Sequence, residues 1–238
     1  MATINELKLA VSGFMQRDQA TFVRGQAPNS FDLLLQACNN ARLYAERRVD
    51  FELARCTAEF VDVNLIEGVR LGVATDRATG GLVTVKKVVT PFLVGSDGSA
   101  RPLDLWTKKK WTEALKRRYE AQHDTSDVLI NLGQLVVVQD GDLLFVAPAD
   151  AAALGGTYTL CADAFKWLTP YTDNTNTDFL LNYAFDWLMY RCIYELNFFL
   201  KEDERVMLSD KLMTEAWNAV VTWNNELVTA NTDDSNLS

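Results

Sequence analysis

The sequence is poor in the residue types from which most metal and catalytic sites are built. It contains one histidine, His123, and four cysteines that form no Cys-x-x-Cys pair: Cys38, Cys56, Cys161 and Cys192. A zinc site of the usual Cys/His spacing cannot be assembled from them. We therefore expect the cysteines to be small buried hydrophobic residues of a protein in a reducing compartment, without disulfides.

Motifs for nucleotide binding and nucleophilic catalysis are also missing. The glycine pairs Gly80-Gly81 and Gly155-Gly156 lack the lysine of a phosphate-binding loop, and no GxGxxG motif follows an expected strand. His123 lies in the polar stretch 122–126, an expected loop with no pattern that would orient an imidazole. We predict that the protein is not an enzyme and that it binds neither a metal nor a cofactor.

Long apolar runs without charge are absent as well. The most apolar segment, 179–200, is interrupted by Asn182, Asp186, Arg191, Glu195 and Asn197. Each charge in the middle of a membrane span costs about 2.5–3.5 kcal/mol on the insertion scale, so we expect a buried or oligomer-facing helix and no membrane. The first ten residues have no apolar core of signal-peptide length.

The net charge of −9 disfavours general binding to nucleic acid, which requires a basic surface. It is compatible with double-stranded DNA that passes close by without sequence-specific binding. The hydrophobic fraction of 48% and the charged fraction of 23% are those of a folded protein.

Hydrophobic periodicity predicts helices at both ends of the chain and strands between them. Helices are expected over 3–15, over 30–48 with Ser30 as N-cap, and over the basic segment 108–120. Strands are expected at 53–61, at 82–89 with Pro91 closing the strand, and at 157–165. The clearest local motif is Asp140-Gly141-Asp142 between two apolar runs, which predicts a hairpin with a type I′ turn and both faces covered.

These elements predict an α+β fold: a helical bundle from the N- and C-terminal helices with an antiparallel β-rich insertion. Residues 1–52 with 166–232 are expected to form the helical body and residues 53–165 the β-rich region with its short basic helix. Residues 233–238 are expected to be a flexible acidic tail.

Two long helices dominate the C-terminal third. The first is expected over 178–201, capped by Thr175 or Thr177, with aromatic residues on every face, so that it needs packing partners nearly all round. The second carries an apolar seam for antiparallel packing or for another chain: Val206, Met213, Val220 and Leu227, with Ala216, Trp223 and Ala230. Residues 201–238 carry a net charge of −5 and residues 108–120 a net charge of +4.

A heterologous contact between identical subunits needs two different, complementary patches. The acidic segment 201–238 and the basic segment 108–120 are such a pair. Ordinary solvated faces explain the same charges, and for the basic helix an acidic protein partner or DNA are further alternatives. The candidate interface residues are Trp187, Tyr190, Tyr194, Trp217, Trp223, Lys108, Lys109, Lys110, Arg117 and Arg118. For the five aromatic residues, a place in the core of their own chain is the alternative.

One family shares the order of the C-terminal elements. Tyr158 to Leu160 ends a strand, Leu168-Thr169 leads into an Asp/Asn-rich turn, an apolar helix follows, and Lys201 to Arg205 form a charged corner before the final helix. This resembles the C-terminal part of the head-to-tail adaptor (head completion, or connector) proteins of tailed bacteriophages, over about residues 155–230.

The resemblance implies a homo-oligomeric ring of roughly twelve copies in the neck of the virion, assembled in the host cytoplasm. The ring would dock under the portal protein, extend the channel for genome packaging and ejection, and offer a platform to a tail or nozzle protein. The family supplies no catalytic residues. A virion-associated cell-wall or polysaccharide hydrolase, with two of the 32 acidic residues converging, and a tail or assembly chaperone remain as alternatives.

Overall fold

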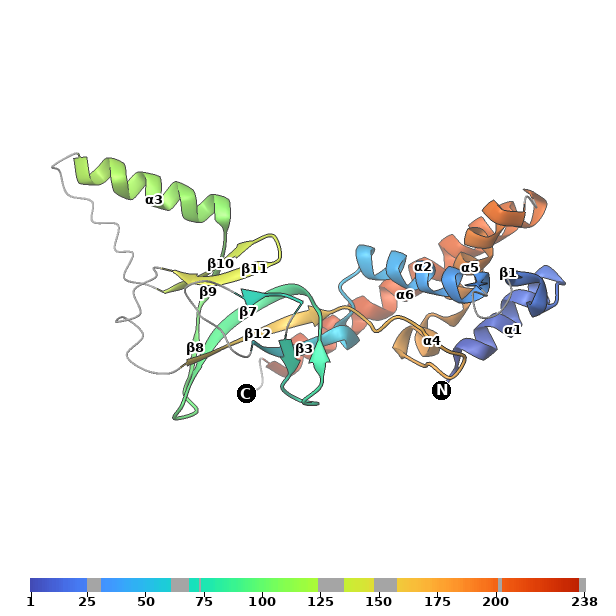
Figure 1. Ribbon diagram of the computed structural model, residues 1–238, viewed down its shortest axis with the longest axis horizontal. Helices are drawn as coiled ribbons and strands as arrows, with labels where there is room; N and C mark the ends of the chain where they lie inside the picture. Colours follow the sequence, from blue (N-terminus) through green and yellow to red (C-terminus); the bar gives the residue numbers. More distant parts are fainter. Residues whose placement is uncertain are drawn as a thin grey trace. The chain divides into compact units, whose positions relative to one another are not determined.

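The computed structural model of the protein describes residues 1–24, 31–60, 69–72, 74–123, 135–147, 158–200 and 203–235. The chain divides into two compact units, Met1–Leu53 with Leu168–Ser238 and Ala54–Trp167. The first unit is helical and the second consists mainly of antiparallel strands, which confirms the predicted α+β class (Figure 1).

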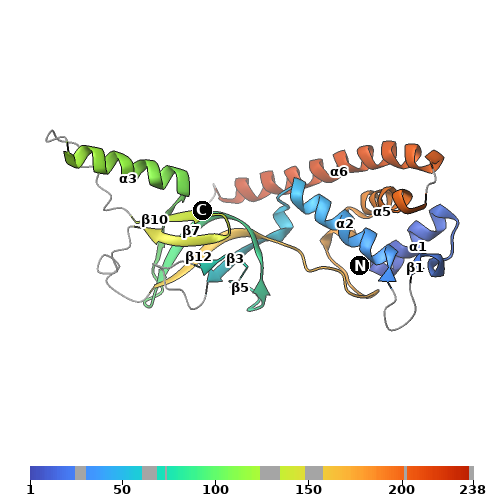
Figure 2. The ribbon, with the colours of Figure 1, turned by 45° about the horizontal axis from the view of Figure 1, so that its top comes forward.

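The helical unit is built around one central helix. Its elements are α1 (Ile4–Met15), η1 (Gln19–Phe22), β1 (Val23–Arg24), β2 (Phe31–Asp32), α2 (Leu33–Arg48), α4 (Phe179–Tyr183), α5 (Phe185–Leu200) and α6 (Asp203–Ser235). Helix α5 contacts α1, α2 and α6, and Figure 2 shows α5 beneath the long α6. Leu188, Ile193 and Leu196 of α5 are therefore buried within the unit.

Side-chain caps define the helix starts. Thr3 forms a capping box with Glu6 at the start of α1. Both caps predicted from the sequence, Ser30 and Thr175 or Thr177, are wrong. Asp32 caps α2 by accepting from the Leu35 N–H at 3.0 Å, and Ser30 lies outside the described residues. Asp178, expected inside the next helix, is itself the cap of α4 and accepts from the Leu181 N–H at 2.9 Å.

The helix expected over 178–201 is broken in two. Ala184 leaves the helical conformation with φ −127° and ψ 23°, so α4 ends at Tyr183 and α5 begins at Phe185. Helix α6 runs antiparallel to α5, because Tyr183 contacts Trp223 and Trp187 contacts Trp217. It continues to Ser235, so Asp233–Ser235 are helical and do not belong to a loose tail.

The seam predicted for α6 is confirmed in its centre. Val220 is buried, and Met213 and Leu227 are partly buried, whereas Ala230 is exposed and does not belong to the seam. The side chain of Val206 lies outside the described residues.

The second unit contains two sheets. The described strands are β3 (Arg55–Phe60), β4 (Val69–Arg70), β5 (Ala74–Asp76), β6 (Leu82–Val83), β7 (Val85–Gly95), β8 (Ala100–Pro102), β9 (Asp104–Thr107), β10 (Val136–Asp140), β11 (Leu143–Ala147) and β12 (Tyr158–Lys166), with η2 (Glu52–Ala54) preceding them. One sheet has the order β6-β5-β3-β12-β7-β8 and the other β4-β11-β10-β9. Alternate residues of both sheets share one core, among them Phe60, Leu160 and Val137.

The predicted hairpin is confirmed, with a different turn. Strands β10 and β11 pair from Asp140 opposite Leu143, so the two turn residues are Gly141 and Asp142. Gly141 has φ +64°, whereas Asp142 is not among the residues with positive φ. This is the type II′ pattern, which needs positive φ only at the first central position, and not type I′.

Pro91 does not end its strand as predicted, because β7 continues through it to Gly95. The Pro91 carbonyl accepts from the Leu103 N–H at 2.9 Å, on the side where the ladder with β8 begins only at Phe92. The N–H that proline lacks would point to this same side, away from β12. Pro91 therefore costs the ladder with β12 no hydrogen bond.

Helix α3 (Lys108–His123) connects β9 to β10, which pair in parallel. This βαβ unit is the one parallel pairing among the described strands. Trp106 and Trp111 cover Val136 and Val138 on the outer face of the hairpin, while Val137 enters the main core. Both faces of the apolar strand are thus covered, as predicted. His123 is the last residue of α3 and not part of a loop.

Candidate interaction surfaces

Trp187 lies at the centre of the helical unit. It is 2% exposed and packs between Tyr44 of α2, at 6.3 Å between ring centroids, and Trp217 of α6, at 4.8 Å. Tyr190 is partly buried and meets Phe14 of α1 edge-on. Of the predicted interface residues, Trp187 is therefore a core residue, and Tyr190 and Trp217 pack mainly within their own chain.

The aromatic residues of α4 and α5 find partners on three sides. Phe179 packs on Phe51, Tyr190 on α1, Trp187 on α2 and α6, and Tyr183 on α6. Most of the described part of this segment is covered within its own unit, whereas Tyr183 and Tyr194 remain exposed. The apolar character of α5 is explained by its central position in the bundle.

Tyr194 remains at the surface, 40% exposed, at the end of a stack of rings and guanidinium groups. Arg191 lies 4.8 Å from the Tyr194 ring and 3.9 Å from Tyr44, and Arg48 lies 4.3 Å from the same Tyr44 ring. Glu195 pairs with Arg191 one turn along α5. Cation–π contacts hold these long side chains in place at the surface.

Trp223 stacks on Tyr183, with 4.7 Å between ring centroids and 16° between planes. Tyr183 is 58% exposed and lines a groove of about 210 Å³ between the α4–α5 break and α6. The groove is floored by Ala216 and Ala219, and the exposed Asp186 lies on its wall. The apolar pattern of the sequence predicts one unbroken helix over 178–201, so the sequence gives no sign of this groove.

The basic residues at the start of α3 have different surroundings. Lys108 pairs with Asp140 at 2.5 Å, and the Lys110 ammonium lies 4.3 Å from the Trp106 ring. Lys109 and Arg117 are exposed, and the side chain of Arg118 lies outside the described residues. All four cations are exposed, and Lys108 and Lys110 also contact residues of their own unit.

A buried polar cluster fixes the segment through which the chain re-enters the helical unit. Arg42 pairs with Glu46 at 2.6 Å and donates to the Leu168 carbonyl at 2.6 Å, while Glu46 accepts from the Leu168 N–H. The Tyr171 hydroxyl donates to Asp178 at 2.8 Å. Burial raises the pKa of Asp178 and, together with the neighbouring carboxylate, the pKa of Tyr171. Arg42 and Glu46 lie one helical turn apart on α2, the spacing at which an ion pair forms along a helix.

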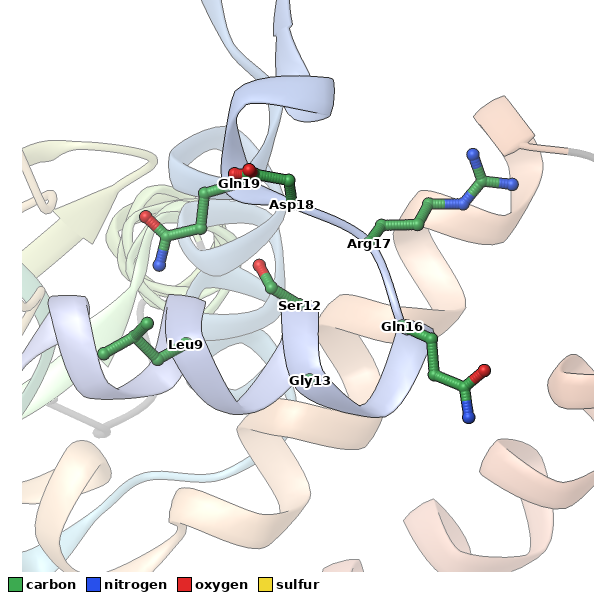
Figure 3. A pocket seen from close by; sticks show the side chains of 7 residues that line it. All are labelled: Leu9, Ser12, Gly13, Gln16, Arg17, Asp18 and Gln19. Atoms are coloured by element: carbon green, nitrogen blue, oxygen red, sulfur yellow. The ribbon is translucent and has the colours of Figure 1, made fainter.

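A second hollow lies where α1 ends. It is lined by Leu9, Ser12, Gly13, Gln16, Arg17, Asp18 and Gln19, whose side chains Figure 3 shows. The Ser12 hydroxyl and the Gln19 amide nitrogen are buried without a hydrogen bond. Because these atoms are inaccessible even to water, they offer nothing to a ligand.

Two buried thiols meet inside the bundle. The Sγ atoms of Cys38 in α2 and Cys192 in α5 are 3.7 Å apart, and all four cysteines are buried and free, as predicted. Within the described ranges, no group of histidine, cysteine or acidic residues is arranged to hold a metal ion. No helix in this part of the chain is long and apolar enough to cross a membrane.

Neither the models of known protein families nor the curated protein sequences contain a match to this chain.

Proposed function

We propose that the protein is a structural virion protein, a head-to-tail adaptor of a tailed bacteriophage. A ring of roughly a dozen copies would dock under the portal, extend the DNA channel and give the tail its attachment platform. The chain would assemble in the host cytoplasm and remain in the neck of the virion.

The order of elements at the C-terminal end carries this proposal. Strand β12 leads through the polar turn 172–177 into α4 and α5, and the long α6 follows. That order is the one in which the sequence resembles the adaptor family. Asn176 organises the turn by accepting from the N–H groups of Thr172 and Asp173, at 2.6 and 2.9 Å.

The surface of the helical unit suits a protein that works through interfaces. Helix α6 has 33 residues, a length of about 50 Å at 1.5 Å per residue. Only one of its faces packs on α5, and the other presents Glu215, Thr222 and Glu226. The net charge of −9 would let DNA slide past without adhering.

Electron microscopy of the full chain mixed with its cognate portal tests the proposal. We expect rings seated on the portal. A monodisperse monomer that is indifferent to the portal would refute it. Genome context gives an independent test, because the neighbouring reading frames should encode the portal and the major capsid protein.

A further inference from the structure

Helix α3 carries a face of exposed cations. Trp111 and Ala114 are partly buried on one face, and Lys109 and Lys116 lie on the opposite, exposed face, two turns apart with Glu113 between them. The exposed Arg117 flanks this face. No ion pair among the described residues involves Lys109 or Arg117.

The groove between the α4–α5 break and α6 is the matching surface. Asp186 is exposed and has no ion pair or hydrogen bond with any described residue. The Tyr183 ring beside it is held by Trp223 and leaves more than half of its surface to solvent. None of the residues that line the groove is basic. An aromatic ring next to a free carboxylate is a favourable site for an ammonium or guanidinium group.

We propose that the exposed face of α3 in one copy of this chain binds the groove of a second copy. The inference rests on the proposed function, because a ring requires each subunit to present two different, complementary surfaces. The cation of Lys109 or Arg117 would enter the groove and lie between Asp186 and the Tyr183 ring.

Size and electrostatics both allow this contact. A volume of about 210 Å³ equals roughly seven water molecules at about 30 Å³ each, which accommodates the end of one long side chain. The N-terminus of α5 places about half a positive charge near the groove, and the full negative charge of Asp186 outweighs it. The groove therefore favours a cation.

Carbodiimide cross-linking of an equal mixture of ¹⁴N- and ¹⁵N-labelled full-length protein tests the contact directly. The reagent joins an amine to a carboxylate within ion-pair distance. We expect mass spectrometry to identify Lys109 or Lys116 joined to Asp186 in peptides of mixed isotope, and Asp186→Asn to abolish them. If these cross-links join only peptides of the same isotope, the contact lies within one chain and the proposal is overturned.

Charge reversal gives a second, independent test. The variant K109E/R117E should weaken association between copies by about tenfold or more, and D186K should do the same. Combining the two restores complementary charge and should recover most of the affinity. The matched control R101E/K211E reverses two other exposed cations and should leave association unchanged. Equal assembly of all four variants would overturn the proposal.

The outcomes separate this contact from the adaptor function. Rings that form on the portal and tolerate every reversal refute the contact and leave the adaptor proposal standing. Copies that associate through α3 and the groove but ignore the portal refute the adaptor and leave the contact. A chain that stays monomeric with and without the portal overturns both.

Discussion

Replacing Trp187 with alanine separates a core role from an interface role. The side chain is 2% exposed and packs between Tyr44 and Trp217. Truncating a buried tryptophan to alanine costs about 3–5 kcal/mol, part of it through the cavity that remains. The lost aromatic pairs account for about 0.5–1.5 kcal/mol each. Tyr194→Ala, on the same helix but 40% exposed, should cost less than about 1 kcal/mol.

Urea unfolding followed by far-ultraviolet circular dichroism measures both variants, because the helical unit dominates that signal. We expect W187A to lower the midpoint strongly and Y194A to leave it near that of the parent chain. A cost below about 1 kcal/mol for W187A, or equal costs for the two variants, would refute the assignment of Trp187 to the core.

Three further predictions concern titrating and reactive groups. Burial raises the pKa of Asp178 in the folded state above the ordinary 3.8, so the folded state binds more protons than the unfolded state. The free energy of unfolding should therefore fall as pH rises from 3.8 through the folded pKa, and the urea midpoint of D178N, which keeps the helix cap, should not show this pH dependence. The pKa of Asp76 is lowered by the hydrogen bond and ion pair with Lys166 at 2.9 Å, so the contribution of this pair to stability should be lost as pH falls below 3.8. D76A should lower the free energy of unfolding by about 1–3 kcal/mol at neutral pH, and an unchanged urea midpoint would contradict the ion pair. The buried cysteines should not react with a thiol-specific dye in the native protein and should react after denaturation, and rapid labelling of the native protein would contradict their burial. A diamide-type oxidant should link Cys38 to Cys192 in preference to any other pair of cysteines.

The fold class was predictable because hydrophobic period distinguishes helices from strands. The helix 3–15 and the strand 53–61 follow their periods, and the Asp-Gly dipeptide located the hairpin. The turn type was not predictable, since register decides which two residues occupy the turn. The place of Pro91 inside β7 depends on where β8 begins to pair, which no local pattern reveals.

The interface residues were harder to predict than the fold. Aromatic content identified Trp187 and Tyr194 equally, yet one is core and the other surface, because the positions of α1, α2 and α6 determine which side of α5 is covered. The break at Ala184 carries no glycine or proline signal, so the groove beside Tyr183 could not be anticipated. We have no physical account of why the helix breaks at this alanine.

The second unit leaves and rejoins the chain through neighbouring strands. Strands β3 and β12 pair in the middle of the sheet, with Arg55 directly opposite Phe165. The chain therefore departs and returns within one strand spacing, about 4.8 Å. Because its two ends lie so close together, recombination could replace the β unit with a short turn or a different module. The residues of the helical unit and the packing between its helices would then stay the same.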